Sequence, residues 1–247
     1  PGHPEGLPGL ERPVYQEQLL NISPTGRVLT SLNVLDLLYR NGLRHYVFRR
    51  LSIHEGARER DLTHLNDVEP LSEGLAGDFE TFEAGDLLVS LRNLHLVFVV
   101  NPDSREIRWH ASLPFVYQHD PDFMEGGWIG VFDNRWDGTE RGAVLGGSRI
   151  VAIKPETGES EVLFPTEKSD AFHTNIVGNW QRLEGGRLLL TESRAGRVVE
   201  VDSTGETIWE WVHRPYDETR VPTLTEATEY DYAAERIGSW RCSPPAR

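Results

Sequence analysis

The feature that most constrains this fold is a plan of strands and turns that occurs three times along the chain. The copies run roughly from Asp61 to Phe115, from Val116 to Pro165 and from Ala171 to His213. Each has a polar stretch around a histidine, two apolar strands, a turn rich in Pro, Asp, Thr and Gly, and a closing strand. A period of roughly 50 residues with about four strands is typical of a β-propeller blade. An ordinary β-sandwich is the alternative, but the three matching turns favour the propeller.

Part of a further unit precedes the three copies, because residues 20–29 resemble the turn and closing strand of the others. We therefore predict an all-β chain, a β-propeller with about 3.5 blades visible, long surface loops and one short helix. The helix is expected over residues 33–42, where Asn33 can cap an apolar stripe that ends at Asn-Gly. The predicted divisions are a flexible tail over 1–18, a partial blade over 19–60, blades over 61–115, 116–170 and 171–213, and an extension over 214–247.

So few units are not enough for a ring of ~4–8 blades. An unclosed stack leaves strand edges that invite pairing with another chain. Three explanations stay open: the C-terminal part of a longer propeller, closure with fewer blades, or a homo-oligomer formed through exposed blade edges. We favour the first.

Composition argues against several functions. Lys plus Arg number 25 and Asp plus Glu number 39, a net charge of −14 that does not favour a nucleic-acid partner. No apolar run approaches the ~20 residues of a membrane helix, so we expect no membrane insertion. The single Cys242 allows no intramolecular disulfide and no cysteine-built zinc site. Because no glycine-rich phosphate loop lies between a strand and a helix, we expect no nucleotide cofactor.

Three histidines mark the repeats: His64, His119 and His173 lie 55 and 54 positions apart. Equivalent positions of neighbouring blades converge on the central channel of a propeller, so we expect these rings to approach one pocket. Histidine is a common acid, base and metal ligand, although an isolated one more often satisfies its own turn. A metal site is one hypothesis, and it needs nitrogen atoms at ~2.0–2.1 Å from a single ion.

Polar residues beside these histidines extend the candidate site. Arg92 follows an apolar strand, and its guanidinium fork can bind a planar or tetrahedral oxyanion. A salt bridge to one of the many acids is the alternative for Arg92. The neighbouring amides are expected to bind substrate; they are Asn66, Asn93 and Asn134.

Together these strings resemble the bacterial arylsulfotransferases, six-bladed propellers that move a sulfuryl group between phenols without a nucleotide sulfate donor. The resemblance covers roughly residues 19–232 and implies that the chain lacks the N-terminal blades of such a propeller. The matching strings are residues 61–66, 90–93, 118–120, 132–134 and 206–209.

The resemblance implies a role for several residues. His119 matches the histidine that attacks sulfur, His64 one that helps to hold the sulfate and the leaving oxygen, and Arg92 an arginine that binds sulfate oxygens. The family also uses a histidine from an earlier blade, which has no obvious counterpart here because the chain is expected to lack those blades; His54 or His45 could substitute for it, but neither lies in a matching string. His173 stands where relatives often carry an aromatic residue, and we include it among the substrate-binding candidates.

The expected function is transfer of a sulfuryl group from an aryl sulfate ester to a phenolic acceptor through a sulfohistidine, with ping-pong kinetics and no metal or cofactor. A catalytically inactive propeller that serves as a binding scaffold is the alternative. The resemblance also implies a periplasmic or secreted location. Several aromatic residues could hold the aryl group, although core packing is the simpler role for most of them; they are Phe115, Tyr117, Phe132 and Trp180.

Overall fold

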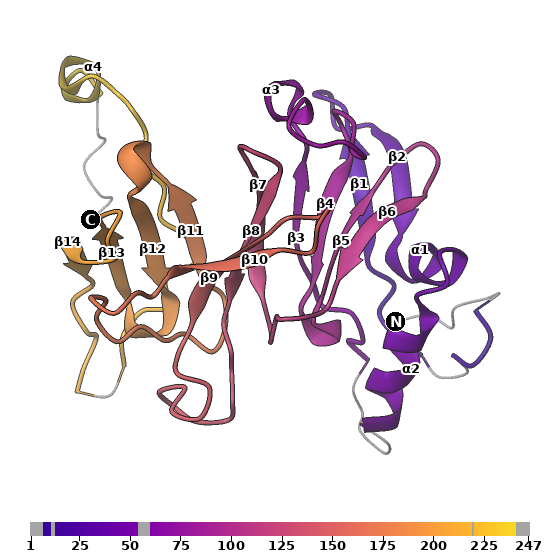
Figure 1. The fold of residues 1–247 in the computed structure, drawn as a ribbon, viewed down its shortest axis with the longest axis horizontal. Helices are drawn as coiled ribbons and strands as arrows, with labels where there is room; N and C mark the ends of the chain where they lie inside the picture. Colours follow the sequence, from indigo (N-terminus) through magenta and orange to yellow (C-terminus); the bar gives the residue numbers. More distant parts are fainter. Residues whose placement is uncertain (1–6, 11–12, 54–59, 219, 241–247) are drawn as a thin grey trace, which may run out of the picture.

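The computed structural model describes residues 7–10, 13–53, 60–218 and 220–240. Four antiparallel sheets dominate it, one of two strands and three of four strands (Figure 1). In each larger sheet the strands pair in chain order as a meander, which is how a propeller blade is built. The predicted all-β class and the repeated β-propeller blades are therefore confirmed.

The small sheet pairs β1 (Gln18–Ile22) with β2 (Val28–Asn33). The first large sheet contains β3 (Leu65–Pro70), β4 (Leu87–Leu91), β5 (Leu96–Val100) and β6 (Ile107–Ala111). The second contains β7 (His119–Met124), β8 (Trp128–Asp133), β9 (Arg149–Ile153) and β10 (Ser160–Phe164). The third contains β11 (Asn179–Arg182), β12 (Leu188–Glu192), β13 (Arg197–Val201) and β14 (Thr207–Val212).

Short helices complete the described chain. The predicted helix is α1 (Val34–Arg40), and Oδ1 of Asn33 accepts a hydrogen bond from the backbone N–H of Asp36 at 3.0 Å. A second helix, α2 (Arg44–Ile53), was not predicted, because basic residues interrupt its apolar pattern. The remaining helical segments are α3 (Glu73–Ala76), η1 (Arg92–Leu94), η2 (Glu184–Gly186), η3 (Ser193–Ala195) and α4 (Ala234–Gly238).

Three apolar layers hold the sheets face to face. Alternate residues of β5 divide between two of these layers, because successive side chains of a strand point to opposite faces. Phe98 packs toward α1 and α2, whereas Val97 packs toward the β7–β10 sheet. Phe132 and Trp180 lie in the third layer, between the second and third large sheets. The core is therefore divided between successive blades.

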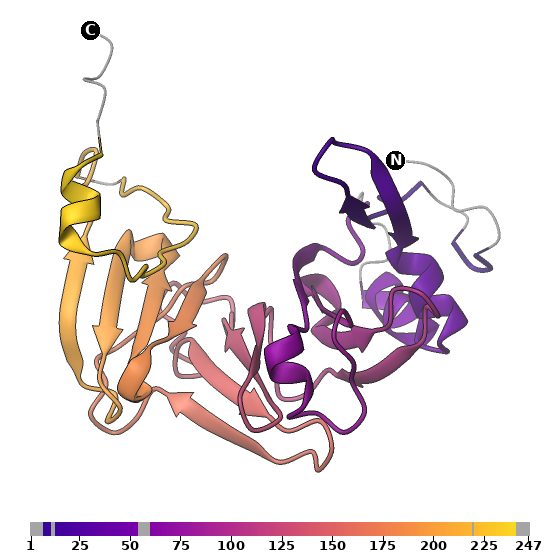
Figure 2. The same cartoon turned by 90° about the horizontal axis from the view of Figure 1, so that it is seen from above.

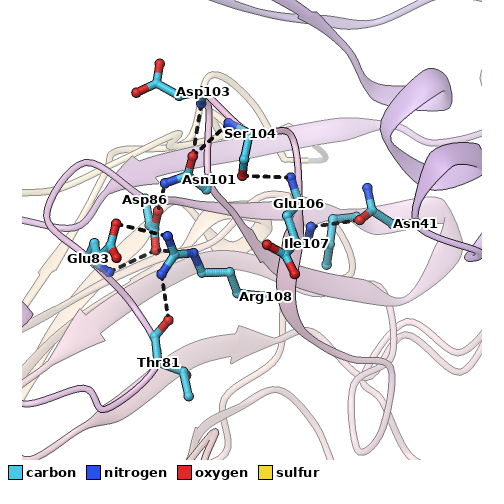
Figure 3. A network of polar contacts seen from close by, with 10 residues as sticks. All are labelled: Asn41, Thr81, Glu83, Asp86, Asn101, Asp103, Ser104, Glu106, Ile107 and Arg108. Carbon is cyan, nitrogen blue, oxygen red and sulfur yellow. Dashed lines mark hydrogen bonds and ion pairs between the residues drawn. The ribbon is translucent and has the colours of Figure 1, made fainter.

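A polar network fixes the turns of the first large sheet and attaches α1 to it (Figure 3). The buried carboxylate of Asp86 accepts a hydrogen bond from Nδ2 of Asn101 at 2.8 Å and pairs with Nε of Arg108 at 3.3 Å. Asn41, just after α1, accepts from the N–H of Ile107 at 2.9 Å and donates to the carbonyl of Arg105 at 3.0 Å.

The sheets follow one another in an arc whose first and last sheets stand apart (Figure 2). Ring closure is therefore not seen among the described residues. Part of the C-terminal extension lies along β11, where Gln181 and Glu229 exchange two hydrogen bonds of 2.8 and 3.2 Å. Among the helices of the described ranges, none is long and apolar enough to cross a membrane.

Candidate functional site

The proposed nucleophile, His119, is the first residue of β7 and pairs with Phe132 of β8. The residue is buried, and Nδ1 of its ring lies 2.7 Å from Oδ1 of Asn134. Asn134 follows β8, so two strands of one sheet bring the pair together. The resemblance pointed to both residues, and the structure joins them directly.

The amide of Asn134 determines which nitrogen of His119 carries a proton. Its Nδ2 group donates to the carbonyl oxygens of Thr174 at 2.9 Å and Val177 at 2.7 Å. Both amide hydrogens are therefore in use, and Oδ1 is the atom left facing the ring. An amide oxygen only accepts, so Nδ1 of His119 is the donor. In the neutral ring, Nε2 then carries the lone pair.

The surroundings of His119 favour the neutral ring. The pKa of His119 is lowered to about 4, chiefly by burial and further by the nearby Arg92 and His64, against the opposing effects of the hydrogen bonds with Asn134 and the Tyr117 backbone. At pH 7 the ring is therefore uncharged and can act as a nucleophile. The same effects show that His64 and Arg92 lie within electrostatic reach of His119.

His64 lies directly before β3, with a backbone φ of 50°. Both its N–H, at 3.0 Å, and its Nδ1, at 2.5 Å, bind the carboxylate of Asp61. This contact fixes the ring and directs Nε2 away from Asp61. Asp61 belongs to the string that carried the resemblance, but sequence reasoning gave it no role of its own.

Arg92 begins η1, directly after β4. Its Cζ lies 4.7 Å from the ring centroid of Tyr117, and its Nη1 donates to Oδ1 of Asn93 at 3.2 Å. The face of an aromatic ring attracts a guanidinium, so Tyr117 supports Arg92 from one side. Of the four aromatic candidates, Tyr117 is the one placed beside Arg92; Phe115, Phe132 and Trp180 are core residues with at most 3% of their surface exposed.

The other expected amides hold the architecture together. Asn93 donates to the carbonyl of Asp61 at 2.9 Å, and Asn66 donates to the carbonyl of Gln118 at 2.8 Å. Asn66 occupies the irregular position in the pairing of β3, so it reaches from one blade to the next. Asp120 occupies the same irregular position of β7 and accepts from the N–H of Trp180 at 2.8 Å. Substrate binding by Asn66, Asn93 and Asn134 stays a prediction.

The expected equivalence of the three histidines is wrong. Asn66 of β3 and Asp120 of β7 occupy equivalent irregular positions in their sheets. Counted back from these positions, His119 corresponds to Leu65, and His64 corresponds to Gln118. His173 lies in the loop before β11, where its Nδ1 is 3.5 Å from Oγ of Ser148. The nearly equal spacing of the histidines in sequence did not give equal positions, because the first strands β3, β7 and β11 begin 54 and then 60 positions apart.

A metal centre finds no support in the geometry. Within the described ranges, no group of three or more His, Cys, Asp or Glu side chains is placed to hold a metal ion. His173 is linked to His119 indirectly: Oγ of Ser148 lies near His173 and donates to the Asn134 carbonyl at 3.0 Å, and the Asn134 side chain contacts His119. Of the two histidines considered as substitutes, His45 lies on α2 and His54 lies outside the described residues.

An acidic groove of about 770 Å³ was not predicted. Its lining includes Glu69 of β3 and Asp120 and Asp122 of β7. Burial, followed by the neighbouring negative charges of Asp120, Glu69 and Asp67, raises the pKa of Asp122 well above its usual range. Burial also raises the pKa of Asp67 to about 6. The run of acids in the first strands was visible in sequence, but their shared burial was not.

A family model described as arylsulfotransferase (ASST) matches residues 9–214. The chain belongs to this family. The match covers the partial blade and all three four-stranded sheets, together with His64, Arg92 and His119. Membership of the ASST family confirms the predicted resemblance.

Solved structures with a related arrangement are more distant. A protein of unknown function from Bacteroides caccae is 15% identical, with a TM-score of 0.49 over 78% of this chain and 58% of that one. Virginiamycin B lyase from Staphylococcus aureus is 11% identical, with a TM-score of 0.42 over 81% and 50%. The WD40 β-propeller domain of Doa1 is 10% identical, with a TM-score of 0.40 over 61% and 41%. The ASST chain thus spans about half of the structures it matches, and no curated protein matches it.

Proposed function

We propose that this ASST-family chain transfers a sulfuryl group from an aryl sulfate ester to a phenol, with Nε2 of His119 as the atom that attacks sulfur. The observation that carries the proposal is the Asn134 amide, which leaves the lone pair of a neutral His119 ring on Nε2. A buried neutral imidazole with a fixed tautomer is a competent nucleophile.

In the first half-reaction the Nε2 lone pair forms an N–S bond as the bond from sulfur to the aryl oxygen breaks. The phenolate leaves with the electron pair and takes a proton from His64, whose ring is oriented by Asp61. In this scheme the positive charge of Arg92 binds the sulfuryl oxygens, and the contact of its guanidinium with the ring of Tyr117 supports this role.

In the second half-reaction a phenol donates its proton to the now neutral His64, and its oxygen attacks the sulfur. The N–S bond breaks, the electron pair returns to Nε2 of His119, and both histidines regain their starting states. Because the first phenol leaves before the acceptor phenol reacts with the covalent intermediate, the expected kinetics are ping-pong, and no metal or organic cofactor takes part.

The test is release of a chromogenic phenol from its sulfate ester, with and without an acceptor phenol. The variant His119→Asn removes the nucleophile, and His110→Asn, at an exposed position of β6, is the matched control. We expect His119→Asn to lower kcat by at least about 10³-fold and the control to be unaffected. Unchanged turnover in a folded His119→Asn protein overturns the proposal.

A second measurement follows the intermediate itself. Incubation with the sulfate ester but without acceptor is expected to add one SO₃ group to the peptide that contains His119, through an acid-labile N–S bond. Loss of this label in His119→Asn, and its discharge by added phenol, are the expected results. A folded wild type that shows neither label nor turnover, yet still binds the ester, favours the alternative of a binding scaffold.

A further inference from the structure

His95 lies between Arg92 and Tyr117 and forms a hydrogen bond with each of them. It follows η1, with φ 50° and ψ 41°, and its backbone N–H donates to the carbonyl of Arg92 at 3.1 Å. Its ring nitrogen Nδ1 accepts the backbone N–H of Tyr117 at 2.9 Å. Left-handed backbone is uncommon for residues other than glycine, and Tyr117 has it too, at φ 58°. Two unfavourable backbone conformations therefore meet at this bond.

The bond requires an unprotonated Nδ1, because a backbone N–H can only donate. The charged groups that face His95 all favour that state: Arg49 and Arg50 come from α2, and Arg92 comes from η1. Burial, followed by these three positive charges, lowers the pKa of His95 to about 4. The accepting nitrogen therefore persists throughout the neutral pH range.

Tyr117 connects His95 to Arg92 and to His119, the two residues with roles in the proposed reaction. Its ring meets the His95 ring edge-on, with centroids 4.5 Å apart, and lies under the guanidinium of Arg92. Two residues further on is His119. Between them the buried Gln118 donates to Oγ of Ser90 at 3.1 Å, so the connecting backbone is also anchored.

We propose that His95 is a positioning residue that holds Tyr117, and through it Arg92 and His119, in the arrangement that sulfuryl transfer needs. The proposal deepens the function proposed above and rests on it for the roles of Arg92 and His119. His95 itself touches neither the ester nor the phenol in this scheme.

The test compares His95→Gln with His95→Met. The two side chains have similar length and meet the same backbone conformation, but Gln offers Tyr117 a strong acceptor, whereas the thioether of Met is only a weak one. In His95→Met we expect the pKa of His119, followed by NMR titration of its ring, to rise toward the ordinary value as the β7 end loosens. We also expect kcat/KM for the aryl sulfate to fall about 100-fold. His95→Gln is expected to keep both close to wild type.

The outcomes separate this proposal from the proposed function. If the wild type turns over no ester, sulfuryl transfer fails while the NMR titration still decides whether His95 positions His119. An unchanged pKa of His119 in a folded His95→Met protein overturns the proposal, and so does a Gln variant as impaired as Met. Should Met prevent folding, the wild type decides: a scalar coupling between the Tyr117 amide nitrogen and Nδ1 of His95 is expected, and its absence overturns the bond.

Discussion

Oδ1 of Asn134 lies 2.7 Å from Nδ1 of His119, while the other end of the same amide holds two carbonyl oxygens of the loop before β11. One side chain therefore sets the tautomer of the proposed nucleophile and joins neighbouring blades. Each of its three hydrogen bonds depends on the orientation of the amide. One substitution at Asn134 can therefore change both the charge beside the His119 ring and the contact between the blades.

Replacement of Asn134 by Asp tests this arrangement. A carboxylate accepts from His119 but adds a negative charge beside the ring, so the pKa of His119 should rise by about one unit or more. Asn21→Asp, on exposed β1, is the control. NMR titration of the His119 ring measures the change, and an unaltered pKa would show that Asn134 does not govern the ring.

Arg92→Lys keeps the positive charge of Arg92 but removes its planar fork and its stacking on Tyr117. We expect the KM for an aryl sulfate to rise about tenfold, with a smaller change in kcat, because Lys binds sulfuryl oxygens as a point charge. Steady-state kinetics on the exposed-site control Arg27→Lys should match wild type. Wild-type KM in Arg92→Lys would mean that charge alone suffices.

His95 and His119 make folding stability sensitive to acid. Their pKa values are lowered to about 4 in the folded chain, from an ordinary value of about 6.5. The unfolded chain therefore binds more protons between these values, and the free energy of unfolding falls as the pH drops from 6.5 toward 4. Denaturant unfolding at several pH values should show a shallower loss in His95→Gln, and an equal loss would contradict the assignment.

Asp122 gives folding stability the opposite dependence on pH. Its pKa is raised in the folded chain, so the unfolded chain loses its proton first and stability falls as the pH rises above about 4. Asp122→Asn removes this dependence and should stabilise the protein at pH 8 by about 1 kcal/mol or more, with little effect near pH 4. The exposed control Glu73→Gln should show no such pattern, and a pH-independent effect of Asp122→Asn would refute the cause.

Asp86 carries the network that fixes the turns of the first large sheet (Figure 3). Asp86→Ala leaves Nδ2 of Asn101 and the guanidinium of Arg108 without this acceptor, which should lower the free energy of unfolding by about 3 kcal/mol. Asp103→Ala, at an exposed turn position, should change it by less than about 0.5 kcal/mol. Equal melting temperatures for the two variants would remove Asp86 from this role.

Much of the fold was predictable because the three repeats are marked by apolar strands and turns. The first strand of each blade was not assigned, because β3, β7 and β11 carry acids and amides in place of an apolar alternation. Helix α2 was missed for a similar reason: only Leu51 and a few other apolar side chains of this basic segment face the core.

The candidate site was predictable in part. The grouping of His64 and Arg92 near His119 followed from the resemblance, and the family match confirms the resemblance itself. The hydrogen bonds from the Asn134 amide to Thr174 and Val177 could not be predicted, because partners 40 or more positions away cannot be inferred from a local sequence pattern. His95 was missed because its proposed role depends on the backbone N–H of Tyr117, a group that every residue except proline provides.

The position of Asn134 between two blades also bears on when the proposed nucleophile becomes competent. Until the loop at Thr174 and Val177 docks, its carbonyls cannot orient the amide, and the proton on the His119 ring is free to change sides. Under the proposed mechanism, the docking of adjacent blades and the fixing of the His119 tautomer are thus one event. By the same mechanism, a half-folded chain would leave sulfate esters untouched, and turnover would report that the blades are correctly stacked.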